Sequence, residues 1–316
     1  MKRPPKRTLF LIGTLCLLIG FLGASCIRQE PDTEFSAPSV YSQRPLTENP
    51  LLHESSFAES EVSAMQETLR GKTVILDPGH GFGDTGCAFP GGSPCEKDLT
   101  PVLVAKIRAA LEADGITVLQ THDGQHFPTS SEMNTLAQSL SYDLDAYLTR
   151  LIRGYSGRDS VRQAETIATF KGGLNDDDLF NIYERSYYAN LLSAGHGAPA
   201  DLFVSVHVNA NADSSALSGF ELYQCTDTPY AERSRELMRA LESGLQNAFP
   251  KTTLRKTAWD WEEAFAVNKY PDMPSVLIES GYATNPADAA NLQNEAWQNA
   301  FARAVADGIE LYLLGI

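Results

Sequence analysis

The chain has 316 residues, 43% of them hydrophobic, which is enough for one large or two modest domains with a sizeable core. Its 25 lysines and arginines face 40 aspartates and glutamates, so the net charge is −15 at pH 7. A surface with this charge repels nucleic acid and anionic membranes, and the composition therefore excludes proteins that bind either one electrostatically.

Residues 1–26 have the pattern of an export signal. Basic residues precede an apolar run, and the run ends in small residues before Cys26. Residues 22–26 also resemble a bacterial lipoprotein box, in which Cys26 would be lipidated, although the leucine stands one position further from the cysteine than usual. Lipidation with a membrane anchor, plain secretion and an uncleaved anchor stay open. All three predict export to the cell envelope or periplasm.

Residues 27–70 are predicted to be a flexible linker, because Pro, Ser, Glu and Thr recur there without a sustained apolar period. A single domain is expected over 71–316. It opens with a buried strand at 73–77, a helix around 99–111 and a second strand at 116–121. A strand, a helix and a strand of these lengths predict a parallel pair joined by a crossover helix.

Residues 124–182 interrupt this alternation and are predicted to be a helical insertion. Leucines and a tyrosine recur along one side of 133–153, which predicts one helix there. A short helical segment is expected near 160–170, followed by an acidic turn.

The alternation of strands and helices resumes after the insertion. The patterns predict a helix from 183 to about 195, strands at 201–208 and 218–225, a helix over 229–249, a buried strand at 275–280 and two helices within 286–313. We therefore predict an α/β domain with a mixed, mainly parallel sheet and helices on both faces.

Two histidines stand at the ends of predicted strands, where ligands of open α/β sheets gather. His80 follows the first strand, and His207 lies near the end of the strand at 201–208. Glu96 lies on the loop between these strands, and Glu279 lies in the strand at 275–280. Two imidazoles and one carboxylate can hold a zinc ion, and a second carboxylate can move protons. The four residues predict a metal-dependent hydrolase.

Four blocks of sequence make this prediction more specific. DPGHGFGDTG, CEKDLT, YERSYYAN…ADLFVSVHVNA and PSVLIESGYATNPADAANL resemble, in this order, the blocks of the zinc-dependent N-acetylmuramoyl-L-alanine amidases, bacterial cell-wall hydrolases of the amidase 3 family. The resemblance spans about 73–312. It implies that His80, Glu96 and His207 bind Zn²⁺ and that Glu279 is the general base. It also implies a peptidoglycan substrate, with hydrolysis of the amide between N-acetylmuramic acid and L-alanine and release of the stem peptide.

Two other functions stay open from the sequence. A zinc-dependent peptidase or carboxypeptidase acting on envelope peptides would use the same residues, but it should add an arginine clamp for a terminal carboxylate. No such clamp is identified near the blocks. A non-catalytic envelope-binding protein would have lost a ligand or the base, and all four residues are present. An activator protein is possible, but the sequence does not indicate which one.

Other polar residues in the blocks are weaker candidates for substrate binding. Asn190 and Asn209 can bind substrate or backbone equally well. Arg185 matches an arginine of the family, and a structural ion pair is favoured over a substrate contact. Asp77 and Asp84 are expected to fix a loop or a ligand ring.

Cysteines and the remaining histidines give further expectations. Cys87 and Cys95 are eight positions apart in a Gly- and Pro-rich loop, and they are expected to form a disulfide in an oxidising compartment, with two free thiols as the alternative. His122 and His126 are expected in a loop rather than as a metal-binding pair on a helix.

The insertion at 124–182 is the main departure from the family. Some relatives carry a regulatory helix that plugs the active site, but it follows the strand with the second histidine, and the corresponding segment 211–218 is short here. A lid, a partner-docking arm and a wall of the substrate groove stay open. We hypothesise that the insertion limits access to the zinc. Unchanged activity on intact wall material after deletion of 125–180 from a folded protein would contradict this hypothesis.

Overall fold

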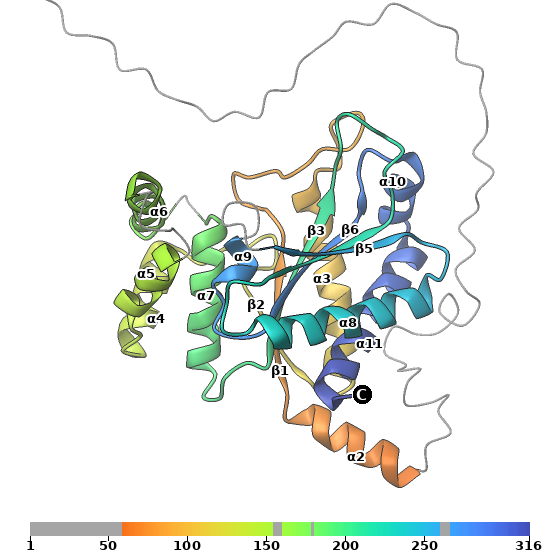
Figure 1. The fold of residues 1–316 in the computed structure, drawn as a ribbon, viewed down its shortest axis with the longest axis horizontal. Helices are drawn as coiled ribbons and strands as arrows, with labels where there is room; N and C mark the ends of the chain where they lie inside the picture. Colours follow the sequence, from red (N-terminus) through yellow and green to blue (C-terminus); the bar gives the residue numbers. More distant parts are fainter. Residues whose placement is uncertain (1–58, 154–159, 178–179, 260–265) are drawn as a thin grey trace, which may run out of the picture. The chain divides into compact units, whose positions relative to one another are not determined.

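The computed structural model describes residues 59–153, 160–177, 180–259 and 266–316, and the structural statements below concern these residues. A six-stranded sheet lies at their centre in the order β2-β1-β3-β6-β4-β5 (Figure 1). Its strands are β1 (Thr73–Pro78), β2 (Thr117–Gln120), β3 (Leu202–Asn209), β4 (Phe220–Cys225), β5 (Leu254–Trp259) and β6 (Ser275–Tyr282). Only β4 and β6 pair antiparallel, which confirms the predicted mixed, mainly parallel sheet.

Helices pack on both faces of the sheet, as predicted. The larger cluster of buried apolar side chains joins one face to α3 (Glu96–Ala113), α8 (Ala231–Ala248) and α11 (Glu295–Leu314). The opposite face packs against α7 (Ile182–Gly195) and the short α9 (Ala266–Lys269). Neighbouring strand residues point to opposite faces, so Val204 and Val206 join the first cluster while Phe203 joins the second.

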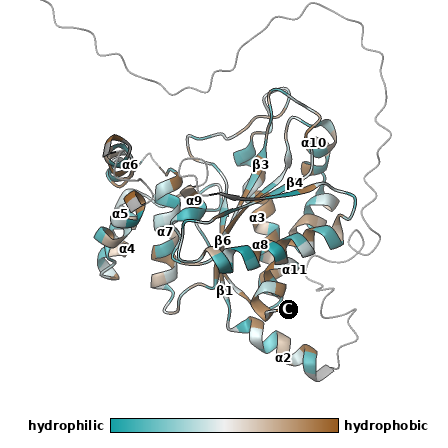
Figure 2. Ribbon diagram, in the orientation of Figure 1, coloured by the Kyte–Doolittle hydropathy of each residue, from teal (hydrophilic) through white to brown (hydrophobic). Residues whose placement is uncertain are grey.

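The helices that cover the sheet are amphipathic, and α8 shows the pattern. Leu237, Leu241 and Leu245 recur every four residues along α8 and are fully buried, while the other sides of this helix are polar. Figure 2 shows the resulting alternation of hydrophilic and hydrophobic colour along α8. The remaining short helix, α10 (Pro286–Leu292), follows β6 directly.

The insertion consists of three helices, α4 (Ser130–Ser139), α5 (Leu144–Arg153) and α6 (Ser160–Gly173). They lie beside α7 (Figure 1) and share with it a cluster of buried aromatic residues that includes Tyr147, Phe170 and Tyr187. The prediction of one helix over 133–153 was wrong. The chain turns at Ser141, which has a φ of 50°, and α5 starts anew where the Asp143 carboxylate accepts a hydrogen bond from the Ala146 N–H at 2.8 Å.

The predicted linker boundary at residue 70 also needs correction. Residues 59–70 form a helix, α2 (Glu59–Arg70), in which Val62, Met65 and Leu69 lie on one side and Leu69 is fully buried. Contact with α11 stabilises this helix, and that contact is not visible in the sequence. The predicted export signal, Cys26 and the linker up to residue 58 lie outside the described residues. Each described helix is too short or too polar to cross a bilayer.

Candidate metal centre

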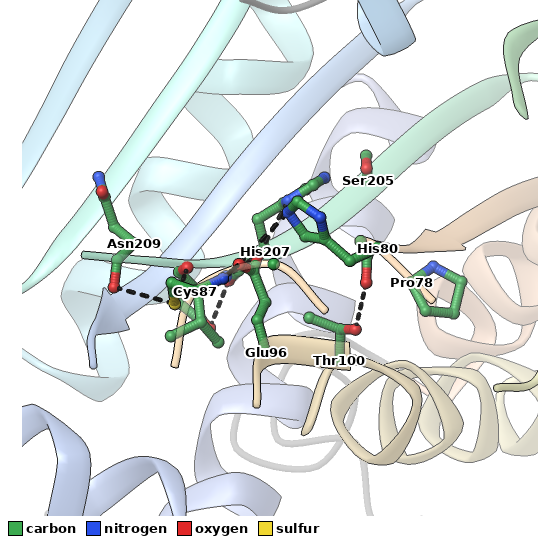
Figure 3. Close-up of polar contacts among 12 residues, drawn as sticks. Pro78, His80, Cys87, Glu96, Thr100, Ser205, His207 and Asn209 are labelled. Atoms are coloured by element: carbon green, nitrogen blue, oxygen red, sulfur yellow. Dashed lines mark hydrogen bonds and ion pairs between the residues drawn. The ribbon is translucent and has the colours of Figure 1, made fainter. Parts of the chain in front are cut away.

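The three predicted ligands converge at one edge of the sheet. His80 follows β1, His207 lies near the end of β3, and Glu96 is the first residue of α3. One nitrogen from each histidine and one carboxylate oxygen lie within 4.8 Å of one another. His80 Nε2 lies 3.3 Å from Glu96 Oε2, and His207 Nδ1 lies 3.0 Å from Glu96 Oε1 (Figure 3). Segments far apart in the chain therefore build one cluster of metal-binding groups.

Backbone groups hold the Glu96 carboxylate in place. Its Oε2 accepts a hydrogen bond from the Cys87 N–H at 3.0 Å, and its Oε1 accepts one from the Val208 N–H at 2.8 Å. Burial opposes ionisation of Glu96, but the hydrogen bonds and charges of His207 and His80 lower its pKa well below the usual range. Glu96 is therefore a buried carboxylate in its charged form.

The His80 ring is oriented by a second carboxylate. Its Nδ1 lies 2.7 Å from Asp84 Oδ2, while Asp84 Oδ1 accepts a hydrogen bond from the Gly86 N–H at 3.0 Å. Burial lowers the pKa of His80, but hydrogen bonds to Asp84 and Glu96 and their charges outweigh it and raise the pKa to about 10. The surroundings thus stabilise positive charge at this point. Asp84 holds the ring of His80, a predicted ligand, as the sequence suggested.

Two glycines make room for the ligands. A Cβ on Gly79 would lie 2.5 Å from the His207 ring. A Cβ on Gly86, which has a φ of +63°, would lie 2.5 Å from Glu96 Oε2. The close approach of the rings and the carboxylate therefore requires glycine at both positions. The sequence analysis missed these roles, although both glycines lie in the block that resembles the amidases.

This donor set fits a zinc ion. Two imidazole nitrogens and one carboxylate oxygen are the ligands of a catalytic zinc site with an open fourth position. A carboxylate on the far nitrogen of a ligand histidine, as Asp84 is on His80, is the usual support for such a ligand. His80, Glu96 and His207 would hold the ion.

A buried ion pair lies behind the His80 turn. The Arg185 guanidinium on α7 donates to Asp77 Oδ1 at 3.0 Å, to the Pro78 carbonyl at 2.8 Å and to the His80 carbonyl. Burial opposes ionisation of Asp77, but Arg185 outweighs it and lowers the pKa of the carboxyl. Because Arg185 is only 4% exposed and all these partners are protein groups, it supports the backbone of a predicted ligand, His80. A substrate contact is not its role in this structure.

His122 belongs to the same buried cluster. Its Nδ1 accepts a hydrogen bond from the Gly124 N–H at 3.1 Å, and its Nε2 lies 2.8 Å from the Pro78 carbonyl. Burial and the nearby Arg185 charge lower the pKa of His122 to about 4, so the ring is neutral at pH 7. His126 is exposed and contacts Asp123. Both histidines lie in the loop between β2 and α4, as the sequence predicted.

Glu279 lies beside the cluster and has an unused oxygen. It stands opposite His207 in the register of β3 and β6. Its Oε2 is buried and has no hydrogen-bond partner among the described residues. Burial and the Glu96 charge raise the pKa of Glu279 well above its usual range. A group that is poorly solvated and close to the predicted ligands is suited to accept and release a proton.

The row of side chains continues across the sheet beyond Glu279. Glu279 faces Glu221 on β4, and Glu221 in turn lies next to Arg255 on β5. Glu221 accepts hydrogen bonds from Arg255 Nε at 2.6 Å and from Asn209 Nδ2 at 3.1 Å. Asn209 is thus held by protein. The sequence did not indicate the role of Glu221 or Arg255, because neither lies in a block that resembles the family.

Asn190 has protein partners for both ends of its amide. Its Nδ2 donates to the Tyr270 carbonyl at 3.0 Å, and its Oδ1 accepts from the Asp272 N–H at 2.6 Å. Since the residue is also 2% exposed, it ties α7 to the segment between α9 and β6 and is not placed to bind substrate.

The predicted disulfide between Cys87 and Cys95 is not formed in the structure. Cys87 and Cys95 are free thiols. Cys87 Sγ lies 3.1 Å from the Val208 carbonyl, whereas Cys95 Sγ lies 3.7 Å from the Gly92 carbonyl. The two side chains therefore have separate partners, because the loop pairs Ala88 with Cys95 and leaves Cys87 against β3.

Comparison with known proteins identifies the family. The model of the Amidase_3 family, described as N-acetylmuramoyl-L-alanine amidase, matches residues 74–146 and 167–311. This chain belongs to that family. The gap in the match falls within the helical insertion.

Curated relatives agree with this assignment. N-acetylmuramoyl-L-alanine amidase LytC of Bacillus subtilis is 28% identical over 244 residues, which are 77% of this chain and 36% of LytC. N-acetylmuramoyl-L-alanine amidase AmiC of Neisseria meningitidis is 26% identical over 77% of this chain and 53% of AmiC. The uncharacterized protein YqiI of B. subtilis is 28% identical over 78% of this chain and 87% of YqiI. The chain thus spans about a third to a half of the two named amidases.

Solved structures show the same fold at lower identity. The amidase CwlD of Clostridioides difficile, solved in complex with the GerS lipoprotein, is 23% identical, with a TM-score of 0.51 over 77% of this chain and 98% of that one. An N-acetylmuramoyl-L-alanine amidase of Clostridium difficile 630 is 22% identical, with a TM-score of 0.52 over 77% of this chain and 96% of that one.

Proposed function

We propose that this protein is a zinc-dependent amidase that hydrolyses the bond between N-acetylmuramic acid and L-alanine in peptidoglycan and so releases stem peptides. The observation that carries the proposal is the convergence of His80, Glu96 and His207 next to Glu279. Membership of the amidase family supports the choice of bond.

Each residue of the centre has a distinct role in this reaction. Bound zinc would supply a water of lowered pKa and a Lewis acid for the carbonyl oxygen. Glu279 accepts the proton of the attacking water and returns it to the nitrogen of the departing alanine, which must leave as an amine. Its raised pKa suits it to hold that proton between the two transfers. Asp84 fixes the His80 ring, and Arg185 fixes the backbone that carries it.

We further propose that the protein works in the cell envelope, attached by a lipid at Cys26. The signal-like sequence of residues 1–26 supports export. Relatives named as probable cell wall amidases, such as LytH of Staphylococcus aureus at 23% identity over 77% of this chain, support the same location.

Mass analysis of digested cell wall tests the reaction. Purified peptidoglycan is incubated with the zinc-loaded protein, with the same protein after chelation, and with Glu279→Gln. We expect intact stem peptides with a free N-terminal alanine only from the zinc-loaded wild type. Shortened peptides still joined to muramic acid would assign a peptidase instead, and no product from any sample would exclude a hydrolase of this polymer.

A further inference from the structure

A groove of about 620 Å³ opens on one side of the metal centre. His80 and His207 line it, together with Thr169 of the insertion helix α6. Phe82, Ile182 and Tyr183 provide apolar and aromatic surface in the same lining. The insertion and the start of α7 therefore form a wall opposite the His80 loop.

The groove is suited to an uncharged ligand. Phe82 and Ile182 are 39% and 38% exposed, which is high for large apolar side chains. The charged side chains in the lining are already paired, since Asp84 bonds His80 and Arg185 bonds Asp77. Among the described residues, the lining offers no unpaired cation to a carboxylate. A sugar ring presents apolar C–H faces and neutral polar groups, and it matches such a surface.

The position of Glu279 gives the direction of the substrate. Glu279 returns a proton to the leaving nitrogen, so the alanine end of the scissile amide lies on its side of the centre. Along the sheet, β6 carries Glu279 on the β4 side of β3, whereas His80 follows β1 on the other side of β3. Most of the groove is lined by the His80 loop and by the segment that leads into α7, a helix that contacts β1. The acyl part of the amide, which bears the muramic acid, then points toward the groove.

The other side of the centre has the complementary chemistry. Beyond Glu279 the row continues through Glu221 to Arg255, whose side chain is 37% exposed. Tyr282 lies under the guanidinium, with 5.6 Å between Arg255 Cζ and the ring centroid. Arg255 is paired with Glu221 through its Nε, but its side chain is 37% exposed, against 5% for Arg185, so its guanidinium can still reach the carboxylates of a stem peptide.

We propose that the groove between His80 and Thr169 binds the N-acetylmuramoyl sugar on the acyl side of the scissile bond, so that the helical insertion is a specificity-determining element. The proposal rests on the amidase function proposed above. It makes the insertion a fixed wall, since α4–α6 share an aromatic core with α7.

A groove-filling variant tests this assignment. Thr169→Trp adds bulk at an exposed position of α6 and should leave folding intact, which a thermal melt verifies. Ala168→Trp is the matched control, because Ala168 is the exposed neighbour and does not line the groove. Values of kcat/KM are measured for three substrates: a lactoyl tripeptide without sugar, the muramoyl tripeptide and the muramoyl dipeptide.

Thr169→Trp should lower kcat/KM about tenfold or more for both muramoyl substrates and far less for the lactoyl tripeptide. Ala168→Trp should behave as wild type on all three. An equal loss on every substrate, a loss that follows peptide length, or no loss at all would overturn the groove assignment alone. If wild type cleaves none of the three, the proposed function fails first, and the groove assignment fails with it.

Discussion

The metal centre is held together by charged and polar side chains, whereas the helical insertion is held together by aromatic packing. The His80 imidazole contacts the Asp84 carboxylate of its own loop and the Glu96 carboxylate of α3. In the insertion, Tyr147 and Phe170 are fully buried, and their ring centroids lie 5.1 Å apart. The family model matches the first region and leaves a gap, 147–166, in the second. Changes in the two regions should therefore affect different properties, activity in one and stability in the other.

The largest effect is expected from loss of a ligand. His207→Ala removes one of three donors, so zinc should no longer copurify and amidase activity should fall to background, with a thermal midpoint close to that of the zinc-free wild type. Metal analysis, turnover on a muramoyl peptide and a thermal melt measure the three quantities. His126→Ala is the control, because this ring is exposed and its ion-pair partner among the described residues is Asp123, which is not a predicted ligand. Full activity of His207→Ala would remove this histidine from the site.

The buried pair behind His80 should affect both properties. Arg185→Met leaves the Asp77 carboxylate buried without its cation, which costs about 3–5 kcal/mol of unfolding free energy. It also frees the His80 carbonyl, so zinc affinity should fall about 10- to 100-fold.

Adding Asp77→Asn tests the cause of these two effects. The double variant should recover part of the stability, because no charge remains buried, but it should not recover the zinc affinity. Denaturant melts and zinc titrations separate the effects. A double variant as unstable as the single one would show that Arg185 acts through packing rather than charge.

Local patterns were sufficient to predict most of the fold and the main residues of the centre. The apolar runs that form β1, β3 and β6 are short, and His80, His207 and Glu279 stand at or near their ends. Such signals are local, and the parallel pairing that brings them together follows from the alternation of strands and helices. The four blocks, in their order along the chain, then indicated which residues are the predicted ligands.

Features that depend on distant contacts were missed. Helix α2 is stabilised by α11, and β5 pairs with β4, neither of which leaves a local pattern. Arg185 and His122 were recognisable as polar residues, but their shared partner, the Pro78 carbonyl, is a backbone atom that no side-chain motif reveals. The free thiols of Cys87 and Cys95 likewise follow from how the loop folds against β3.

Removal of an aromatic ring from the insertion should lower stability and leave zinc binding unchanged, which is the opposite of the effect expected at the metal centre. Phe170→Ala should destabilise the insertion by about 3–5 kcal/mol, because the side chain is fully buried in the aromatic cluster. Zinc content should stay at the wild-type level, since no described ligand lies in that cluster. Amide hydrogen exchange should rise in α4–α6 while β1 and β3 stay protected. Uniform loss of protection would mean that the two regions unfold as one unit.

The smallest effect is expected at Glu184, where α7 packs against the insertion. It should appear as a dependence of stability on pH. Glu184, in the first turn of α7, accepts a hydrogen bond from the Asn181 N–H at 2.8 Å, but its Oε1 is buried without a hydrogen-bond partner among the described residues. Burial raises the pKa of Glu184 from 4.5 to about 7. The folded state then binds more protons than the unfolded chain between these values, so stability should fall as pH rises through that window, by at most about 3 kcal/mol.

Glu184→Gln removes the ionisation while keeping an acceptor for Asn181. Denaturant melts from pH 4 to pH 8 should show a flatter profile for this variant and greater stability than wild type above pH 7. Glu165→Gln, at an exposed position of α6, is the matched control and should keep the wild-type slope. Identical slopes for Glu184→Gln and wild type would mean that the carboxyl ionises as it does in the unfolded chain. Water would then reach the Glu184 carboxylate in the folded protein.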